Sequence, residues 1–266
     1  MSSPAAELPA EHNGHSREFV QSLERGLSVL RTFTADAPAL SLSDVARRAD
    51  LTRATARRLL HTFESLGYMR SQGKLFELTP KVLDLGYAYV SSLRLPDIAQ
   101  PYMEELSERV NESVSAAVLD GNDIVYVARV PTKHIMSISL GIGSRLPATT
   151  TSMGRVLLAE LPESELECFL KRVTIEARTT RTIVDAEALH HELAEIRRLG
   201  YAINNQELED SVRSVAVPLR DGQKRAIAAL NIGTHAGRVS LRDLRATMLP
   251  ELLRTAAQIN AGLARR

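Results

Sequence analysis

The sequence LSLSDVARRADLTRATARRLLHTFESLGYMRSQGKLFEL, residues 40–78, decides the fold of the N-terminal part of the chain. Ser41, followed three residues later by Asp44, predicts the start of a helix, because each side chain can bond the other residue's backbone amide. Thr52 predicts the cap of a second helix, and Gly67 predicts its end. Two short helices separated by a tight turn are typical of a helix-turn-helix.

The second helix separates apolar from basic side chains. The apolar side chains have the spacing of a face directed toward a core, and they are Ala56, Leu59, Leu60, Phe63 and Leu66. The opposite face carries Arg53, Ala54, Arg57, Arg58 and His61. In this motif the second helix enters the major groove of DNA, where arginines reach phosphates or guanine edges.

The local charge distinguishes a DNA-binding helix from an ordinary helix with solvated arginines. Between Arg47 and Lys74 the chain has seven basic and two acidic residues, a local charge of +5, whereas the whole chain has a net charge of +1. Such focusing is typical of a nucleic-acid site. The predicted DNA-binding residues are Ser43, Thr52, Arg53, Ala54, Thr55, Arg57, Arg58, His61 and Lys74.

The flanking segments complete a small domain. Residues 68–70 and 75–78, which are mostly apolar, flank the polar stretch 71–74, and this pattern predicts a hairpin. Its tip carries Lys74 and would touch the DNA backbone or minor groove. Before the pair of helices, residues 19–33 predict another helix, capped at Ser22. Its helically spaced apolar residues would pack behind the pair, and they are Leu23, Leu27, Leu30 and Phe33. The combination is a winged helix-turn-helix.

Length and composition limit the class of protein. The 266 residues suffice for two domains, and no apolar run approaches the roughly 20 residues that span a bilayer. The N-terminus lacks the pattern of a secretory signal. A single cysteine, Cys168, excludes an internal disulfide and a multi-thiolate metal site, which fits a reducing cytoplasm; we expect it in a core or interface. The histidines have no metal-ligand spacing, and we predict neither metal nor cofactor.

The second half of the chain predicts an antiparallel sheet with helices on at least one face. Strand-like runs surround Asp120-Gly121-Asn122 and Asp221-Gly222, and a further strand is expected over 135–140. We expect a loop over 144–151 and helices near 152–160, after Pro162, after Asp185 and after Ser240, the last with a kink before Pro250. A helix from Pro80 to Leu93 and another from Pro96 to Asn111 lie between the two halves.

With these elements in order, the chain resembles the IclR family of bacterial transcriptional regulators along nearly its full length. The resemblance is carried by SLERGLSVL (22–30), LSDVARRADLTRATARRLLHTFESLGYM (42–69), LPATTTSMGRVLLA (146–159) and GYAINNQELEDSVRSVAVPLRD (200–221). It implies an α+β multidomain protein with a winged helix-turn-helix domain (18–79), a linker helix (80–94) and a GAF-like α/β effector domain with an antiparallel sheet (95–266). The Ser, Pro, Ala and Glu content of residues 1–17 predicts a disordered lead-in before them. The resemblance also implies homodimers, often paired into tetramers, on an operator.

The predicted effector site surrounds a helix N-terminus. Hydroxyls at 149–152 beside free backbone amides suit a carboxylate, and Arg145 would add a charge-assisted pair; alternatively, the threonines only cap the helix. The resemblance adds residues from the polar stretch 204–207 and from the paired strands around Ser214 and Asn231. The predicted set is Arg145, Thr149, Thr150, Thr151, Ser152, Met153, Gly154, Asn204, Glu207, Ser214 and Asn231. Ser152-Met153 and Asn231 with Gly233 depart from the commoner family pattern and would alter the shape of the pocket.

The sequence therefore predicts an effector-responsive, cytoplasmic, DNA-binding regulator. It looks most like the β-ketoadipate-pathway branch, whose members respond to 4-hydroxybenzoate, protocatechuate or β-ketoadipate; its partners would be operator DNA, an aromatic or dicarboxylic acid and, for an activator, RNA polymerase. The linker helix would transmit effector binding to the recognition helices. Two alternatives stay open: an enzyme acting on such an acid, with Glu207 and Glu209 as a carboxylate pair, and a constitutive DNA-binding protein. No nucleophile–base pair supports the enzyme.

Overall fold

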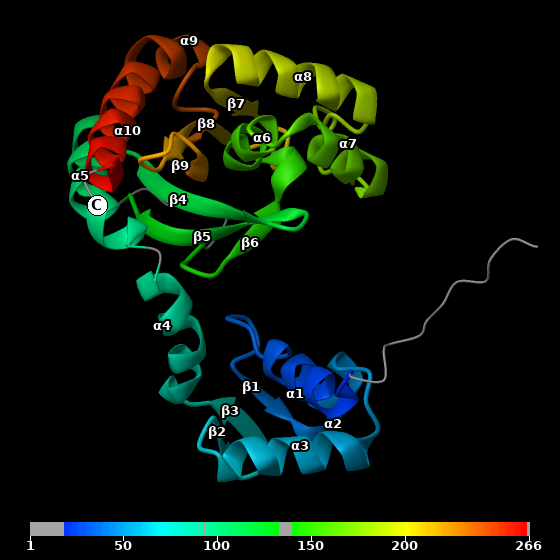
Figure 1. The fold of residues 1–266 in the computed structure, drawn as a ribbon. Coiled ribbons are helices and arrows are strands. Elements are labelled where there is room, and N and C mark those ends of the chain that lie inside the picture. Colours follow the sequence, from blue (N-terminus) through cyan, green and yellow to red (C-terminus); the bar gives the residue numbers. More distant parts are fainter. Residues whose placement is uncertain (1–18, 93, 133–139, 265–266) are drawn as a thin grey trace, which may run out of the picture. The chain divides into compact units, whose positions relative to one another are not determined.

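The computed structural model of the chain describes residues 19–92, 94–132 and 140–264 (Figure 1). The chain divides into two compact units, Met1–Tyr89 and Val90–Arg266. Each unit has its own hydrophobic core. None of the described helices is both long and apolar enough to cross a membrane. The predicted lead-in (1–17) and most of the predicted strand at 135–140 lie outside the described residues.

The N-terminal unit is a helical core with a small sheet. Its elements are α1 (Gln21–Arg31), β1 (Ala39–Ser41), α2 (Leu42–Arg48), α3 (Arg53–Ser65), β2 (Met69–Gln72) and β3 (Leu75–Leu78). The strands form an antiparallel sheet in the order β1-β3-β2, so the predicted hairpin is confirmed. The sequence did not predict β1, in which Leu40 pairs with Phe76 across the sheet. Short edge strands of this kind are fixed by their partner strand rather than by a pattern of their own.

The predicted ends of α2 and α3 are confirmed by their hydrogen bonds. The backbone amide of Asp44 donates to Ser41 Oγ over 3.2 Å, and the amide of Thr55 donates to Thr52 Oγ1 over 3.2 Å. Gly67 ends α3 with a φ of +80°, a left-handed conformation that glycine adopts without strain. The helix-turn-helix is therefore fixed by local chemistry that the sequence already contains.

The prediction for α1 was wrong at two points. The helix begins at Gln21, so Ser22 lies inside it, and its N-cap residue makes no side-chain hydrogen bond. Leu23 and Leu27 are 63% and 43% exposed, because α1 packs through the face that carries Gly26 and Val29. Two apolar positions of the helical spacing therefore lie on the surface of the chain.

The C-terminal unit is a six-stranded antiparallel sheet in the order β6-β5-β4-β9-β8-β7. The strands are β4 (Ser113–Asp120), β5 (Asp123–Val130), β6 (Arg145–Pro147), β7 (Ala202–Asn205), β8 (Val212–Arg220) and β9 (Ala226–His235). The helices that follow α4 (Leu83–Ser92) are α5 (Leu95–Val110), α6 (Ser152–Ala159), α7 (Glu163–Arg172), α8 (Ala186–Leu199), α9 (Leu241–Asp243) and α10 (Leu249–Ala264). α5 and α10 cover one face of the sheet, and α6 and α8 lie on the other (Figure 1).

The structure corrects the predictions for the loop at 144–151 and for Cys168 in the core, and it confirms an irregularity before Pro250 and a helical linker. The predicted loop at 144–151 contains β6 and a short 3-10 helix at Ala148–Thr150. Cys168 is exposed on α7, because the core-facing positions of that helix are Leu166 and Phe169. The expected irregularity before Pro250 is a π-helical turn over Leu244–Met248. The predicted linker is helical, as a 3-10 turn (Pro80–Val82) that continues into α4.

Candidate functional site

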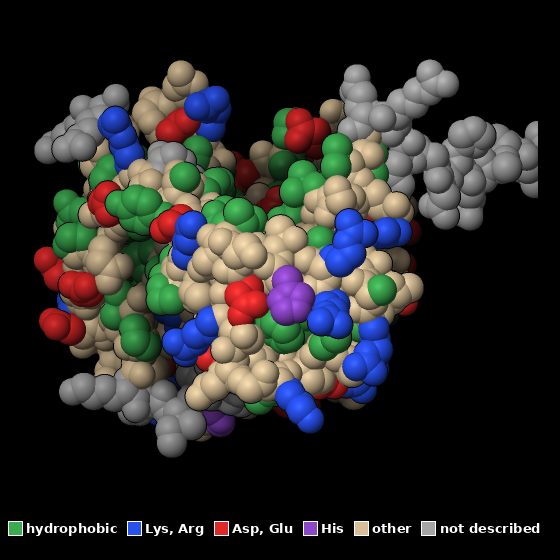
Figure 2. All heavy atoms as spheres, turned by 90° about the horizontal axis from the view of Figure 1, so that it is seen from below, with side chains coloured by type: hydrophobic (Ala, Val, Ile, Leu, Met, Phe, Trp, Pro, Cys, Tyr) green, Lys and Arg blue, Asp and Glu red, His purple; other side chains and the backbone are tan. Residues whose placement is uncertain are grey.

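The first candidate site is the outer face of α3. Arg53, Arg57 and Arg58 are exposed on it, and within residues 19–92 none of the three makes an ion pair. Lys and Arg side chains gather on this face in Figure 2. The other predicted DNA-binding residues are also accessible; Thr55 is half-buried, and the exposed ones are Ser43, Thr52, Ala54, His61 and Lys74. A row of unpaired guanidinium groups on the second helix of this motif suits contacts with phosphates and base edges.

Side chains connect α3 to the hairpin of β2 and β3. His61 Nδ1 lies 3.2 Å from a Glu64 carboxylate oxygen, and its ring packs edge-on against Phe76 with centroids 6.1 Å apart. Ser71 donates its hydroxyl to the other Glu64 oxygen. The hydrogen bond from Ser71, followed by that from His61, holds the pKa of the Glu64 carboxyl below its usual value. Glu64 therefore fixes the hairpin, with Lys74 near its tip, relative to the recognition helix.

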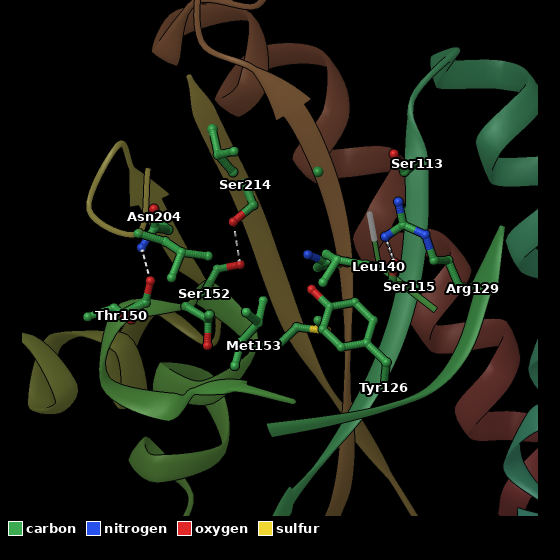
Figure 3. A pocket seen from close by; sticks show the side chains of 16 residues that line it. Ser113, Ser115, Tyr126, Arg129, Leu140, Thr150, Ser152, Met153, Asn204 and Ser214 are labelled. Carbon is green, nitrogen blue, oxygen red and sulfur yellow. Dashed lines mark hydrogen bonds between the residues drawn. The ribbon is translucent and has the colours of Figure 1, made fainter. Parts of the chain in front are cut away.

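The second candidate site is a cavity between the sheet and the start of α6 (Figure 3). Seven of the predicted effector residues line it: Thr150, Thr151, Ser152, Met153, Asn204, Ser214 and Asn231. Gly233, which was expected to shape the pocket, also lines it, and the sequence did not predict the remaining lining residues, which are Ser113, Ser115, Tyr126, Arg129, Leu140, Leu146, Leu208 and Val212. Strands β4, β5, β7, β8 and β9 and the turn before α6 all contribute.

Hydrogen bonds hold part of the lining in place. Ser152 Oγ and Ser214 Oγ lie 2.8 Å apart, which joins α6 to β8, and the Asn204 amide donates to the Thr150 carbonyl over 2.7 Å (Figure 3). Thr151 caps α6 by accepting from the Gly154 amide, as the sequence predicted. The threonine run therefore has a capping role, and it also forms a wall of the cavity.

Three buried polar atoms of the lining lack a hydrogen-bond partner. They are Ser113 Oγ, Thr150 Oγ1 and Asn231 Oδ1, and no other buried side-chain nitrogen or oxygen in the described part of the chain is in this state. A buried donor or acceptor without a partner costs about 1–3 kcal/mol. Three such atoms in one cavity can be satisfied by water or by a polar guest that displaces it.

Arg129 is the cation of the cavity lining. It is half-buried on β5, its Nη1 donates to Ser115 Oγ over a long 3.4 Å, and it makes no ion pair among the described residues. Figure 3 shows Arg129 with Ser113 and Ser115 on one side of the cavity and Asn204 with Thr150 on the other. A guanidinium without a counter-ion, facing a partly apolar cavity, suits a carboxylate.

A β-bulge explains why Arg129 was missed. Tyr126 and Arg129 are three residues apart, so regular alternation would place them on opposite faces of the sheet. In the pairing of β4 with β5, Ala116 lies opposite Ala128 and Ala117 lies opposite Tyr126, so Val127 is an extra residue without a partner on β4. The extra residue brings Tyr126 and Arg129 to the same face. Burial raises the pKa of the Tyr126 phenol to about 12, so the phenol is neutral near neutral pH and offers a proton to a guest.

Four of the predicted effector residues do not line this cavity. Arg145 lies exposed on β6, where it donates hydrogen bonds to the carboxylates of Asp120 over 2.6 Å and Asp123 over 3.2 Å, and these bonds raise its pKa. Thr149 is buried next to the cavity wall. Gly154 packs so closely that an added Cβ would overlap the carbonyl of the preceding turn. The fourth is Glu207, a buried residue in an ion pair.

The carboxylates of the candidate enzyme site are engaged elsewhere. Glu207 is bonded to Arg155, and Glu209 accepts from Ser211 over 3.0 Å. Within the described residues no three His, Cys, Asp or Glu side chains are grouped as metal ligands. The geometry thus defines a class: a winged helix-turn-helix unit joined to an α/β unit with a small-molecule cavity.

Comparison with known proteins identifies the family. Residues 22–73 match the IclR helix-turn-helix domain, and residues 87–261 match the family described as bacterial transcriptional regulator IclR C-terminal. The chain is 43% identical over 237 residues to the Pca regulon regulatory protein of Pseudomonas putida, covering 89% of this chain and 81% of that protein. The chain belongs to the IclR family and is a transcriptional regulator, as its relatives are, rather than an enzyme.

Solved structures show the same fold. A transcriptional regulator from Rhodococcus sp. RHA1 aligns with a TM-score of 0.83 and 50% identity, over 93% of this chain and 99% of that one. An IclR homologue from Microbacterium hydrocarbonoxydans, complexed with 4-hydroxybenzoate, aligns with a TM-score of 0.81 and 28% identity, over 92% of this chain and 100% of that one. The predicted α+β architecture with an antiparallel sheet is confirmed.

Proposed function

We propose that this regulator acts in the cytoplasm and binds an operator through α3 and the β2–β3 hairpin. Its effector is a small aromatic or dicarboxylic acid that binds in the cavity between the sheet and the start of α6. The observation that carries the proposal is the cavity itself. Among the described residues, it combines an arginine without a counter-ion with three buried polar atoms that lack partners. An acid with a second polar group would satisfy both features.

The chemistry of the lining supports an acid that carries a second polar group. Arg129 and the hydroxyl of Ser115 would bind its carboxylate, while Asn231 and Thr150 would take a hydroxyl or keto group. Met153 and Tyr126 offer apolar surface for a ring. The names of two similar proteins agree: one regulates a Pca regulon, and the other was crystallised with 4-hydroxybenzoate. Catabolism of aromatic acids is therefore the pathway we propose this protein controls.

We also propose that the protein works as a homodimer. Leu83, Leu85 and Tyr87 of α4 are 74%, 56% and 73% exposed, and a helix with apolar side chains all round is usually buried against a partner. Two recognition helices must match half-sites about one turn of DNA apart. A change of the dimer on effector binding, carried by α4, would shift that separation. Light scattering on the purified protein tests the dimer, and a monomer would contradict it.

A ligand screen tests the effector. The full chain is heated with 4-hydroxybenzoate, protocatechuate or β-ketoadipate, and calorimetry follows any acid that raises the melting temperature. An acid that binds the native state alone stabilises it by about 2.7 kcal/mol at a hundredfold excess over its Kd, which gives a clear shift. Stabilisation by one of these acids supports the proposal. The absence of any shift and any heat would refute the effector class and leave the DNA-binding surface unaffected.

A further inference from the structure

A buried ion pair lies behind the cavity wall. Arg155 of α6 is 1% exposed and Glu207 is 7% exposed. Arg155 Nη1 donates to Glu207 Oε1 over 2.8 Å, and Nη2 donates to the second carboxylate oxygen. Neither residue lines the cavity. The DNA surface and the effector contacts described above make no use of this pair.

The pair closes a ring of hydrogen bonds through two walls of the cavity. Arg155 Nε donates to the Thr149 carbonyl over 2.8 Å, and the next carbonyl, that of Thr150, accepts from the Asn204 amide over 2.7 Å. Asn204 Oδ1 accepts from the Glu207 backbone amide over 3.3 Å. The Glu207 carboxylate then returns the ring to Arg155. Thr150 and Asn204, two members of this ring, face the cavity.

The loop that carries Glu207 has a second anchor. The Glu207 carbonyl accepts from Thr182 Oγ1 over 2.7 Å, and the Ile183 amide approaches the carboxylate at 3.4 Å. The following residue, Leu208, lines the cavity. The carboxylate therefore provides one of the anchors of this loop, beside the threonine hydroxyls that bind the carbonyls of Gln206 and Glu207.

Stability alone does not account for such a pair. Taking two charges out of water is costly, and replacing a buried ion pair by apolar residues of similar volume is often neutral or stabilising. Apolar side chains cannot bind the Thr149 carbonyl or orient the loop at 204–208. What the ion pair adds is a fixed position for polar groups, and a preformed site binds its ligand more tightly than a mobile one.

We propose that Arg155 and Glu207 are positioning residues for the effector: their ion pair holds the turn before α6 and the loop after β7 in the arrangement that binds the acid. The proposal rests on the proposed function, because it names what keeps that cavity preformed. It predicts that the pair sets effector affinity without setting the stability of the fold.

The test replaces both partners in the full chain, as Arg155→Met with Glu207→Leu. We expect the melting temperature without effector to stay within about 10 °C of the wild type, because replacing the pair itself is often neutral while the buried Thr149 carbonyl loses its donor. Calorimetry with 4-hydroxybenzoate, protocatechuate and β-ketoadipate as probes should show at least about a tenfold rise in Kd for whichever binds the wild type. The matched control is Arg220→Met with Glu160→Leu, which removes a half-buried ion pair at the other end of α6, away from the cavity. The control should keep the wild-type Kd.

A second measurement needs no effector. Amide hydrogen exchange of the ligand-free protein should become at least about tenfold faster at 150–154 and 204–208 in the double variant, with β8 and β9 unchanged. Unchanged exchange there, or an unchanged Kd, would overturn the proposal. If no probe binds the wild type, the effector class fails, and the exchange data still decide the role of the pair. If the double variant does not fold, Arg155→Lys, which keeps the charge but loses the Thr149 contact, is judged by the same criteria.

Discussion

Replacing Arg129 by methionine should separate effector binding from folding. Methionine keeps an apolar stem of similar length and removes the charge that we assign to the effector carboxylate. A hydrogen bond to a charged group contributes about 1.5–3 kcal/mol. Since about 1.4 kcal/mol changes an equilibrium constant tenfold, the Kd for the acid should rise about 10- to 150-fold. With the residues that the structure describes, Arg129 makes one long hydrogen bond and no ion pair, so the free energy of unfolding without effector should change by less than about 0.5 kcal/mol.

The assay is isothermal calorimetry on the full chain, with Arg145→Met as the control. Arg145 is the cation that the sequence predicted, but in the structure it pairs with Asp120 and Asp123 outside the cavity. Exposed pairs of this kind contribute about 0–1 kcal/mol to stability, and the effector Kd of the control should equal that of the wild type. An Arg129→Met protein that binds the acid as tightly as the wild type would refute the assignment, as would a loss of binding in the control.

Three further predictions concern other parts of the molecule. Arg58→Ala should weaken operator binding and reduce the slope of log K against log salt by about 1, measured by fluorescence anisotropy at several salt concentrations. Gly154→Ala should destabilise the protein by about 1–3 kcal/mol in urea unfolding, because its Cβ would overlap the Ala148 carbonyl. The lowered pKa of Glu64, caused first by Ser71, stabilises the fold above the carboxyl's usual pKa of 4.5, and this contribution is lost as pH falls through the lower, folded-state pKa. Calorimetry between pH 6 and pH 3 should therefore show a smaller acid destabilisation in Glu64→Gln.

Each of these predictions has a matched control. Arg198→Ala removes an exposed arginine of the C-terminal unit and should leave the salt slope unchanged. Gly141→Ala adds a Cβ in open space in the loop before β6, and it should change the free energy of unfolding by less than about 0.5 kcal/mol. Glu165→Gln removes an exposed carboxyl that makes no side-chain hydrogen bond or ion pair with the described residues, and it should leave the acid destabilisation at the wild-type value. A Gly154→Ala protein as stable as the wild type, or equal acid destabilisation in Glu64→Gln and the wild type, would contradict the packing and linkage arguments.

The DNA-binding unit could be predicted from the sequence because local chemistry specifies it. The hydroxyls of Ser41 and Thr52 cap the helices that they were expected to cap, and Gly67 takes the left-handed conformation that ends α3. The buried face of α1 could not be predicted in the same way. Its apolar residues surround more than one side of the helix, and packing through Gly26 decided which side is buried.

The cavity was predicted only in part, for reasons of topology. The lining residues at the start of α6 are contiguous in the sequence, and the expected N-terminus of that helix was enough to predict them. Arg129 reaches the same cavity only because of the bulge at Val127, and a bulge has no reliable signal in a single sequence. A charged residue in the apolar run IVYVARV was the available hint. Arg145 was assigned from its proximity in sequence, whereas the pairing of β6 with β5 places it beside Asp123.

The most direct test of the central claim is the operator affinity of the full chain with and without saturating effector. The operator is a duplex selected from a random pool, and the acid is the one that binds in calorimetry. Couplings between two sites are typically about 1–3 kcal/mol, so the operator Kd should change about 5- to 150-fold, or the footprint should shift, and Arg129→Met should show neither change at the same acid concentration. An operator Kd and footprint that stay the same while the acid is demonstrably bound would contradict the account.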